Sequence, residues 1–240
     1  MSKAELEALE NEVNAELLAR AKAEHPDIYP ITDGVIDEAQ FLASSPKMLW
    51  ILKEPWEIGG FGDWSLTKKL IPDLIVQNQI CGHKSYGPMA YVTFSVFNNF
   101  LVYADIRAAG NTSKIGESLK NISYINVSKL PGKSQSIPSQ IAAHYRTNRS
   151  ILLKQIMVIN PDVVIGGSTL TLFLDDLGLT NEEFKPTGSL KFCVKAQRLY
   201  IDAYHPARRD HQVKTSDYVD EIVSVIKNHC PALHLSALSP

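Results

Sequence analysis

The chain has 240 residues and a formal net charge of −2, and 45% of its residues are hydrophobic while 21% are charged. This composition is typical of a globular protein with a sizeable core, and it excludes a protein that holds nucleic acid through a broad basic face. No apolar run approaches the roughly 20 residues of a membrane-spanning helix, and the charged N-terminus is unlike a signal peptide.

The first expected element is an amphipathic helix over residues 2–24. Leu6, Leu9, Val13 and Leu17 recur at helical spacing, with glutamates on the other faces. We expect this helix to pack on the domain rather than to serve oligomerisation.

Strands and helices then alternate along the chain. Short apolar runs predict four core strands, and a further strand is expected at an edge or in a hairpin at 190–195. The core strands are 47–52, 122–127, 162–166 and 198–203. Helical stretches are expected at 88–109, 137–160, 169–178 and 215–229. This order favours one domain over residues 1–240, a three-layer α/β/α sandwich around a four-stranded, mostly parallel sheet.

The longest irregular stretch is expected at about residues 54–87. It carries Phe61, Trp64 and Tyr86 among glycines. A long loop inside a domain is usually functional or disordered, and embedded aromatic residues favour the functional interpretation.

Two strand ends carry residues suited to catalysis. Glu54 follows the strand at 47–52, and His205 follows the strand at 198–203. Each precedes a proline, which restricts the backbone of the residue before it and so fixes its orientation. Open α/β sheets bind their ligands beyond the carboxyl ends of their strands.

Four segments in order resemble motifs of the uracil-DNA glycosylase superfamily, mostly of its iron–sulfur branch, over roughly residues 45–230. They are Ile51-Leu52-Lys53-Glu54-Pro55, the segment 124–132 with Asn126 in its strand, the segment 152–168 with its helix and strand, and Ala203-Tyr204-His205-Pro206-Ala207. The resemblance implies hydrolysis of the bond between a damaged base, such as uracil, and deoxyribose in DNA, after the nucleotide has been flipped out.

The chemistry of these side chains fits the roles that the resemblance implies. Glu54 would position water and stabilise the sugar cation, and His205 would stabilise the leaving base. Asn126 would read the base edge, while Trp64 or Tyr86 would stack on the base. The DNA backbone would be contacted by Lys129, Gly167, Ser168, Arg208 and Arg209.

The motifs also depart from the family pattern. Leu52 replaces a glycine that opens the first motif, Ala207 replaces the serine of the last, and Leu130 stands at a cluster cysteine. The chain has 3 cysteines, fewer than the four thiolates of a [4Fe–4S] cluster, and their spacing matches neither disulfide nor metal motifs. We therefore expect a divergent relative without metal or organic cofactor.

Structural roles remain open for each of these residues. Glu54 could pair with Lys53, Lys129 or Arg208, and Asn126 could satisfy backbone groups at its strand end. The alternative function is a catalytically silent nucleic-acid or nucleotide-binding module, and a small-molecule hydrolase on the same sheet edge is a third. We expect a cytoplasmic monomer whose partner is DNA, duplex or single-stranded, with no membrane contact.

Overall fold

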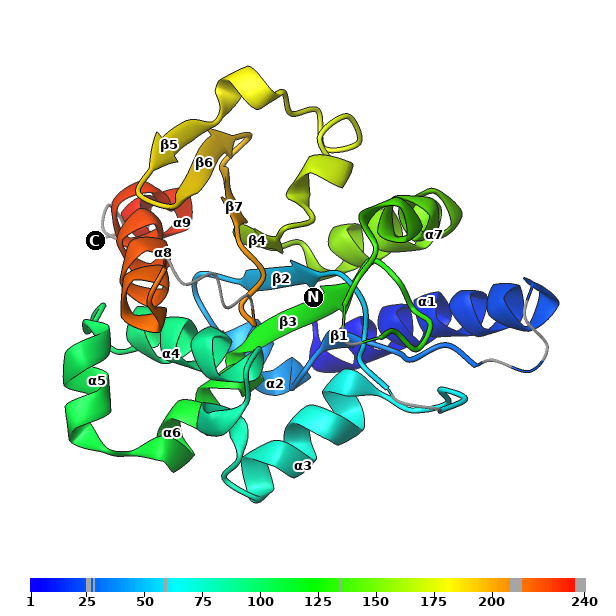
Figure 1. Cartoon of the computed structure of the whole chain (residues 1–240), viewed down its shortest axis with the longest axis horizontal. Helices are drawn as coiled ribbons and strands as arrows, with labels where there is room; N and C mark the ends of the chain where they lie inside the picture. The colour runs from blue at the N-terminus through cyan, green and yellow to red at the C-terminus, as the bar shows by residue number, and fades with distance from the viewer. Residues whose placement is uncertain (25–26, 28, 58–59, 134, 208–212, 236–240) are drawn as a thin grey trace.

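A seven-stranded sheet with strand order β1-β3-β2-β4-β7-β6-β5 forms the centre of the molecule (Figure 1). The computed structural model describes residues 1–240 except 25–26, 28, 58–59, 134, 208–212 and 236–240. The four central strands are parallel. They are β2 (Met48–Leu52), β3 (Ile122–Asn126), β4 (Val163–Gly167) and β7 (Arg198–Ala203). Every residue of β2, β3 and β4 is buried, as a parallel sheet covered on both faces requires, so these strand predictions are confirmed.

The outer strands are antiparallel to their neighbours and enlarge the sheet beyond the expected four strands. β6 (Leu190–Lys195) pairs with β7, β5 (Lys185–Thr187) pairs with β6, and β1 (Gly34–Val35) pairs with β3. β6 is the strand that the sequence placed at an edge or in a hairpin. β1 and β5 are too short, at 2 and 3 residues, to show a readable alternation of apolar and polar residues.

Helices cover both faces of the sheet (Figure 1). One face carries α1 (Lys3–Glu24) and α7 (Pro138–Ile159), which pack against each other. The other face carries α4 (Tyr86–Phe97) and α8 (Thr215–His229). The remaining helices of the described residues are α2 (Glu38–Ala43), α3 (Ile71–Val76), α5 (Tyr103–Ala109), α6 (Thr112–Glu117) and α9 (Pro231–Leu235). No helix of the described residues has the length and apolar character needed to cross a membrane.

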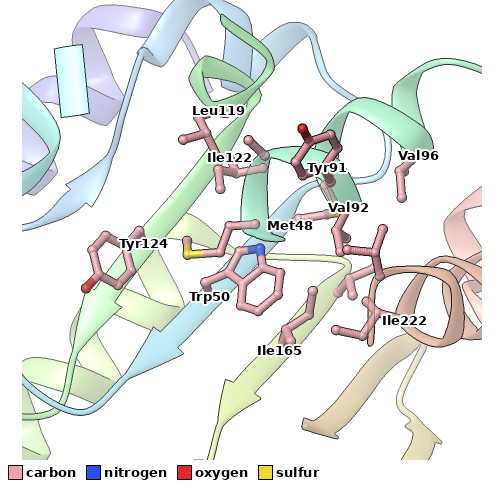
Figure 2. Packing of buried hydrophobic residues seen from close by; sticks show 14 of the residues in the cluster. Met48, Trp50, Tyr91, Val92, Val96, Leu119, Ile122, Tyr124, Ile165 and Ile222 are labelled. Carbon is pink, nitrogen blue, oxygen red and sulfur yellow. The ribbon is translucent and has the colours of Figure 1, made fainter. Parts of the chain in front are cut away.

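The core between the sheet and α4 is filled by large side chains of the central strands. Figure 2 shows Trp50 and Ile165 from neighbouring strands packed against Val92 of α4 and Ile222 of α8. All four side chains are fully buried. Burial of this kind contributes roughly 1.5–3 kcal/mol for each large apolar side chain, and it holds the strand ends in a fixed register.

Three expected elements differ from the structure. The stretch 88–109 is two helices, because Asn99 and Phe100 adopt positive φ angles of 56° and 58° that break the helix. The stretch 169–178 contains only a 3-10 turn at Leu170–Leu172. The supposedly irregular stretch 54–87 holds a π-helical turn at Leu66–Leu70 that continues into α3.

Candidate active site at the carboxyl edge of the sheet

The parallel strands end in one row at the carboxyl edge of the sheet. Leu52 at the end of β2 pairs with Asn126 at the end of β3, and Gly167 of β4 pairs with Ala203 of β7. Glu54 and His205 each lie two residues beyond this row. Because β4 separates β2 from β7, the backbones that carry Glu54 and His205 are about 10 Å apart where the strands end, twice the usual strand spacing.

The backbone that follows Glu54 runs alongside the loop after β3. The Gly132 amide donates to the Pro55 carbonyl at 2.7 Å, and the Glu57 amide donates to the Gly132 carbonyl at 3.2 Å. A Cβ on Gly132 would lie 2.5 Å from Glu54 Cγ, so the glycine makes room for this side chain. Glu54 is half-buried, and its carboxylate has no hydrogen bond or ion pair within the described part of the chain. No partner within the described residues thus holds this acid, and Arg208, one of its suggested partners, lies outside them.

His205 is a neutral hydrogen-bond donor in this environment. Its backbone amide donates to Ser168 Oγ at 3.1 Å, and its Nδ1 accepts the Ala207 amide at 3.1 Å. Burial, aided by the charge of Lys53, lowers the pKa of His205 to about 4. The ring is therefore neutral at pH 7, and because Nδ1 is an acceptor the ring proton lies on Nε2.

Asn126 is completely buried and only partly hydrogen-bonded. Its Oδ1 accepts the Tyr124 hydroxyl at 3.0 Å, and its backbone amide donates to Asp33 Oδ2 at 2.8 Å. Its Nδ2 has no partner among the described residues. An unpaired buried amide donor is unfavourable by about 1–3 kcal/mol, which an incoming acceptor could relieve.

Lys129 is not available for the phosphate contact that the sequence suggested. The side chain is 1% exposed, and its Nζ donates to Asp33 Oδ1 at 2.6 Å and to Gln155 Oε1 at 2.8 Å. The suggested pairing of Lys129 with Glu54 is wrong for the same reason. Burial lowers the pKa of Lys129, and the Asp33 carboxylate opposes that shift.

Tyr86 does not present an open ring for a base, and Trp64 presents its ring only in part. Tyr86 is 5% exposed, stacks on His83 at a ring-centroid distance of 4.2 Å and meets Tyr124 edge-on. Burial raises the pKa of its hydroxyl well above the usual range. Trp64 is half-buried and packs against the core. Base stacking by Tyr86 would require its ring to leave its present partners.

Gly167 and Ser168 lie against the segment that carries His205. A Cβ on Gly167 would overlap Leu52 Cδ2 and would lie 3.3 Å from Pro206 Cδ and 3.5 Å from His205 Cα. Ser168, at a positive φ of 59°, accepts the His205 amide through its hydroxyl. Both residues thus position the histidine, and the predicted contacts of Arg208 and Arg209 lie outside the described residues.

Leu52 packs against the end of β4 at the carboxyl edge of the sheet. Its side chain is 1% exposed and lies against Gly167, opposite Asn126 in the strand register. The neighbouring pocket, lined by Tyr204, His205 and Tyr218 among others, has a volume of about 30 Å³. This cavity beside His205 has room for water but not for a base.

Sequence reasoning missed three residues of this edge as site residues. The charge of Lys53 helps to lower the pKa of His205. The Asp33 carboxylate accepts the backbone amide of Asn126 at the end of β3. Trp56, two residues beyond Glu54, is 60% exposed. For Trp56 a signal existed, since it directly follows Glu54-Pro55. Asp33 lies in a segment without any motif.

No protein-family model matches the sequence, and a search of curated proteins also found no match. Within the described residues, no group of three or more His, Cys, Asp or Glu side chains is placed to hold a metal ion.

Proposed function

We propose that this protein hydrolyses the N-glycosidic bond of uracil or another damaged base in DNA, on a uracil-DNA glycosylase-like α/β/α fold. The observation that carries the proposal is the placement of an acid, an amide and a neutral histidine at three strand ends of one sheet edge. Glu54, Asn126 and His205 come from β2, β3 and β7, all parallel. About 10 Å separates the first and third of these backbones, because β4 lies between them.

The side chains divide the reaction between them. Glu54 orients a water molecule toward C1′ and stabilises the cationic sugar as the bond from C1′ to the base nitrogen breaks. The water oxygen stays on C1′, and one of its protons passes by way of the carboxylate or solvent to the departing base. His205 donates from Nε2 to the base oxygen that becomes negative, a role that requires the neutral ring created by its low pKa.

The test is strand cleavage at abasic sites after alkali treatment. Labelled oligonucleotides carrying uracil, hypoxanthine, xanthine or a T·G mismatch are incubated with wild type, Glu54→Gln and His205→Asn. Wild type should cleave at least one of them, and each variant should lose at least about tenfold in rate, which corresponds to about 1.4 kcal/mol. Glu182→Gln, an exposed carboxylate on another part of the surface, is the matched control and should retain the rate.

A second candidate is a binding module that has lost catalysis. The leucine at position 52 favours it, because it stands where the resembling family has a glycine, and its buried side chain packs against Gly167. DNA binding by wild type without abasic sites on any of the four substrates would select this candidate over the hydrolase.

A further inference from the structure

The exposed aromatic side chains lie on neighbouring backbone segments. Among the described Phe, Trp and Tyr residues, only Tyr29, Trp56 and Phe61 are exposed, by 42%, 60% and 71%. We call these three residues the aromatic rim. Trp56 lies two residues beyond Glu54, so the rim adjoins the candidate active site. Exposed apolar groups that gather at one place mark interaction surfaces.

Backbone hydrogen bonds hold the segments of the rim together. The Tyr29 amide donates to the Phe61 carbonyl at 2.8 Å, and the Gly62 amide donates to the Glu57 carboxylate at 3.2 Å. Gly62 has a positive φ of 78°, and a Cβ there would collide with the Tyr29 carbonyl oxygen. Trp56 forms a parallel bridge with Gly132 of the loop after β3. The three aromatic residues therefore belong to backbone segments that hydrogen bonds hold in place.

The rim carries no excess of positive charge. Among the described residues, Lys53 and Lys133 lie on the backbone segments next to Trp56, whereas Asp27, Glu54, Glu57 and Asp63 each lie within two residues of a rim residue. Such a surface attracts the phosphates of a duplex only weakly, because affinity for duplex DNA grows with the number of cations that meet phosphates. Flat exposed rings instead suit the faces of bases, which are accessible in a single strand and covered by neighbours in a duplex.

We propose that the aromatic rim stacks bases that neighbour the flipped nucleotide in single-stranded DNA, and that the protein therefore prefers single strands to duplex. This inference rests on the proposed glycosylase function, since it places the bound strand beside Glu54. Trp56 carries the largest share, because it is the biggest of the three rings and the nearest in sequence to Glu54.

The experiment measures binding by fluorescence anisotropy, with an undamaged thymidine oligonucleotide of about 12 nucleotides and with the same strand paired to its complement. Wild type should bind the single strand about tenfold or more tightly than the duplex. Trp56→Ala should weaken single-strand binding by about fivefold to about 150-fold, the range for loss of one stacked base. Trp56→Phe should retain most of the affinity, and Met157→Ala, an exposed apolar residue of α7, should bind as wild type does.

Equal affinity for single strand and duplex would overturn the inference, as would a Trp56→Ala variant that binds as tightly as wild type. A Trp56→Leu variant tests the alternative of a protein-docking patch, because leucine keeps an apolar surface without a stacking ring. Unchanged single-strand affinity of Trp56→Leu would also overturn the inference.

The two proposals fail in different ways. The binding assay contains no damaged base and does not depend on bond cleavage. Single-strand preference without cleavage of any substrate would support the stacking surface and refute the hydrolase. Cleavage of duplex substrate faster than of single strand would support the hydrolase and overturn the strand preference.

Discussion

Breaking the buried ion pair of Lys129 and Asp33 should destabilise the protein strongly. Both side chains are essentially unexposed, and their charged atoms are 2.6 Å apart. Removing one partner of such a pair typically costs about 3–5 kcal/mol, because the other charge remains buried. In Lys129→Met the Asp33 carboxylate keeps hydrogen bonds from the Asn126 amide at 2.8 Å and from Gln155 Nε2 at 2.9 Å. We therefore expect Lys129→Met to lower the free energy of unfolding by about 3 kcal/mol, at the lower end of that range.

The free energy of unfolding, measured by urea denaturation followed by circular dichroism, tests this value. Lys133→Met, an exposed lysine of the same loop, is the control and should change stability by less than about 0.5 kcal/mol. The double variant Asp33→Asn with Lys129→Met should lose at least about 1 kcal/mol less than the sum of the two single losses. A loss below about 1 kcal/mol for Lys129→Met, with weakened DNA binding instead, would refute the reasoning and restore the phosphate contact.

Three further predictions concern the site and its surroundings. Leu52→Ala should destabilise the fold by about 2–5 kcal/mol, because it truncates a fully buried side chain that packs against Gly167. Urea denaturation measures this loss, and a change below about 1 kcal/mol would contradict that packing. Nuclear magnetic resonance titration should show His205 neutral from pH 8 down to about 5, because burial lowers its pKa from the usual 6.5 to about 4. The contribution of His205 to the free energy of unfolding is then constant above about pH 6.5 and becomes unfavourable as the pH falls toward 4. A titration midpoint near 6.5 would refute the burial argument. Burial raises the pKa of Glu10 to about 7, so the folded state holds a proton that the unfolded state releases above about pH 4.5. Stability therefore falls as the pH rises from about 4.5 through 7. Glu10→Gln should stabilise the protein at pH 8 and have little effect at pH 4, and equal effects at both pH values would contradict this linkage.

The centre of the fold could be predicted from the sequence, because fully buried parallel strands need unbroken apolar runs. The runs at 47–52 and 198–203 contain the observed β2 and β7. The edge strands were less readable, since a strand of two residues carries no periodicity. The break between α4 and α5 depends on positive φ angles at Asn99 and Phe100, and phenylalanine is not a residue whose type suggests such a conformation.

The candidate site could be predicted only in part. The apolar runs correctly identified the two strands after which Glu54 and His205 lie. The burial of Lys129 was not readable, because its partner Asp33 lies 96 residues earlier in the chain. Residue type alone suggested a surface cation, whereas long-range packing made this lysine part of the core.

The two outermost strands of the sheet determine whether copies of the protein can join edge to edge at high concentration. An unpaired strand edge is a template to which another chain can add a strand. Here one edge is β1, with 2 residues, and the other is β5, whose 3 residues include the exposed Lys185 and Pro186. A proline cannot donate a ladder hydrogen bond, and a lysine brings repulsion between identical chains. Edge-to-edge growth into aggregates is thus disfavoured at both ends of the sheet.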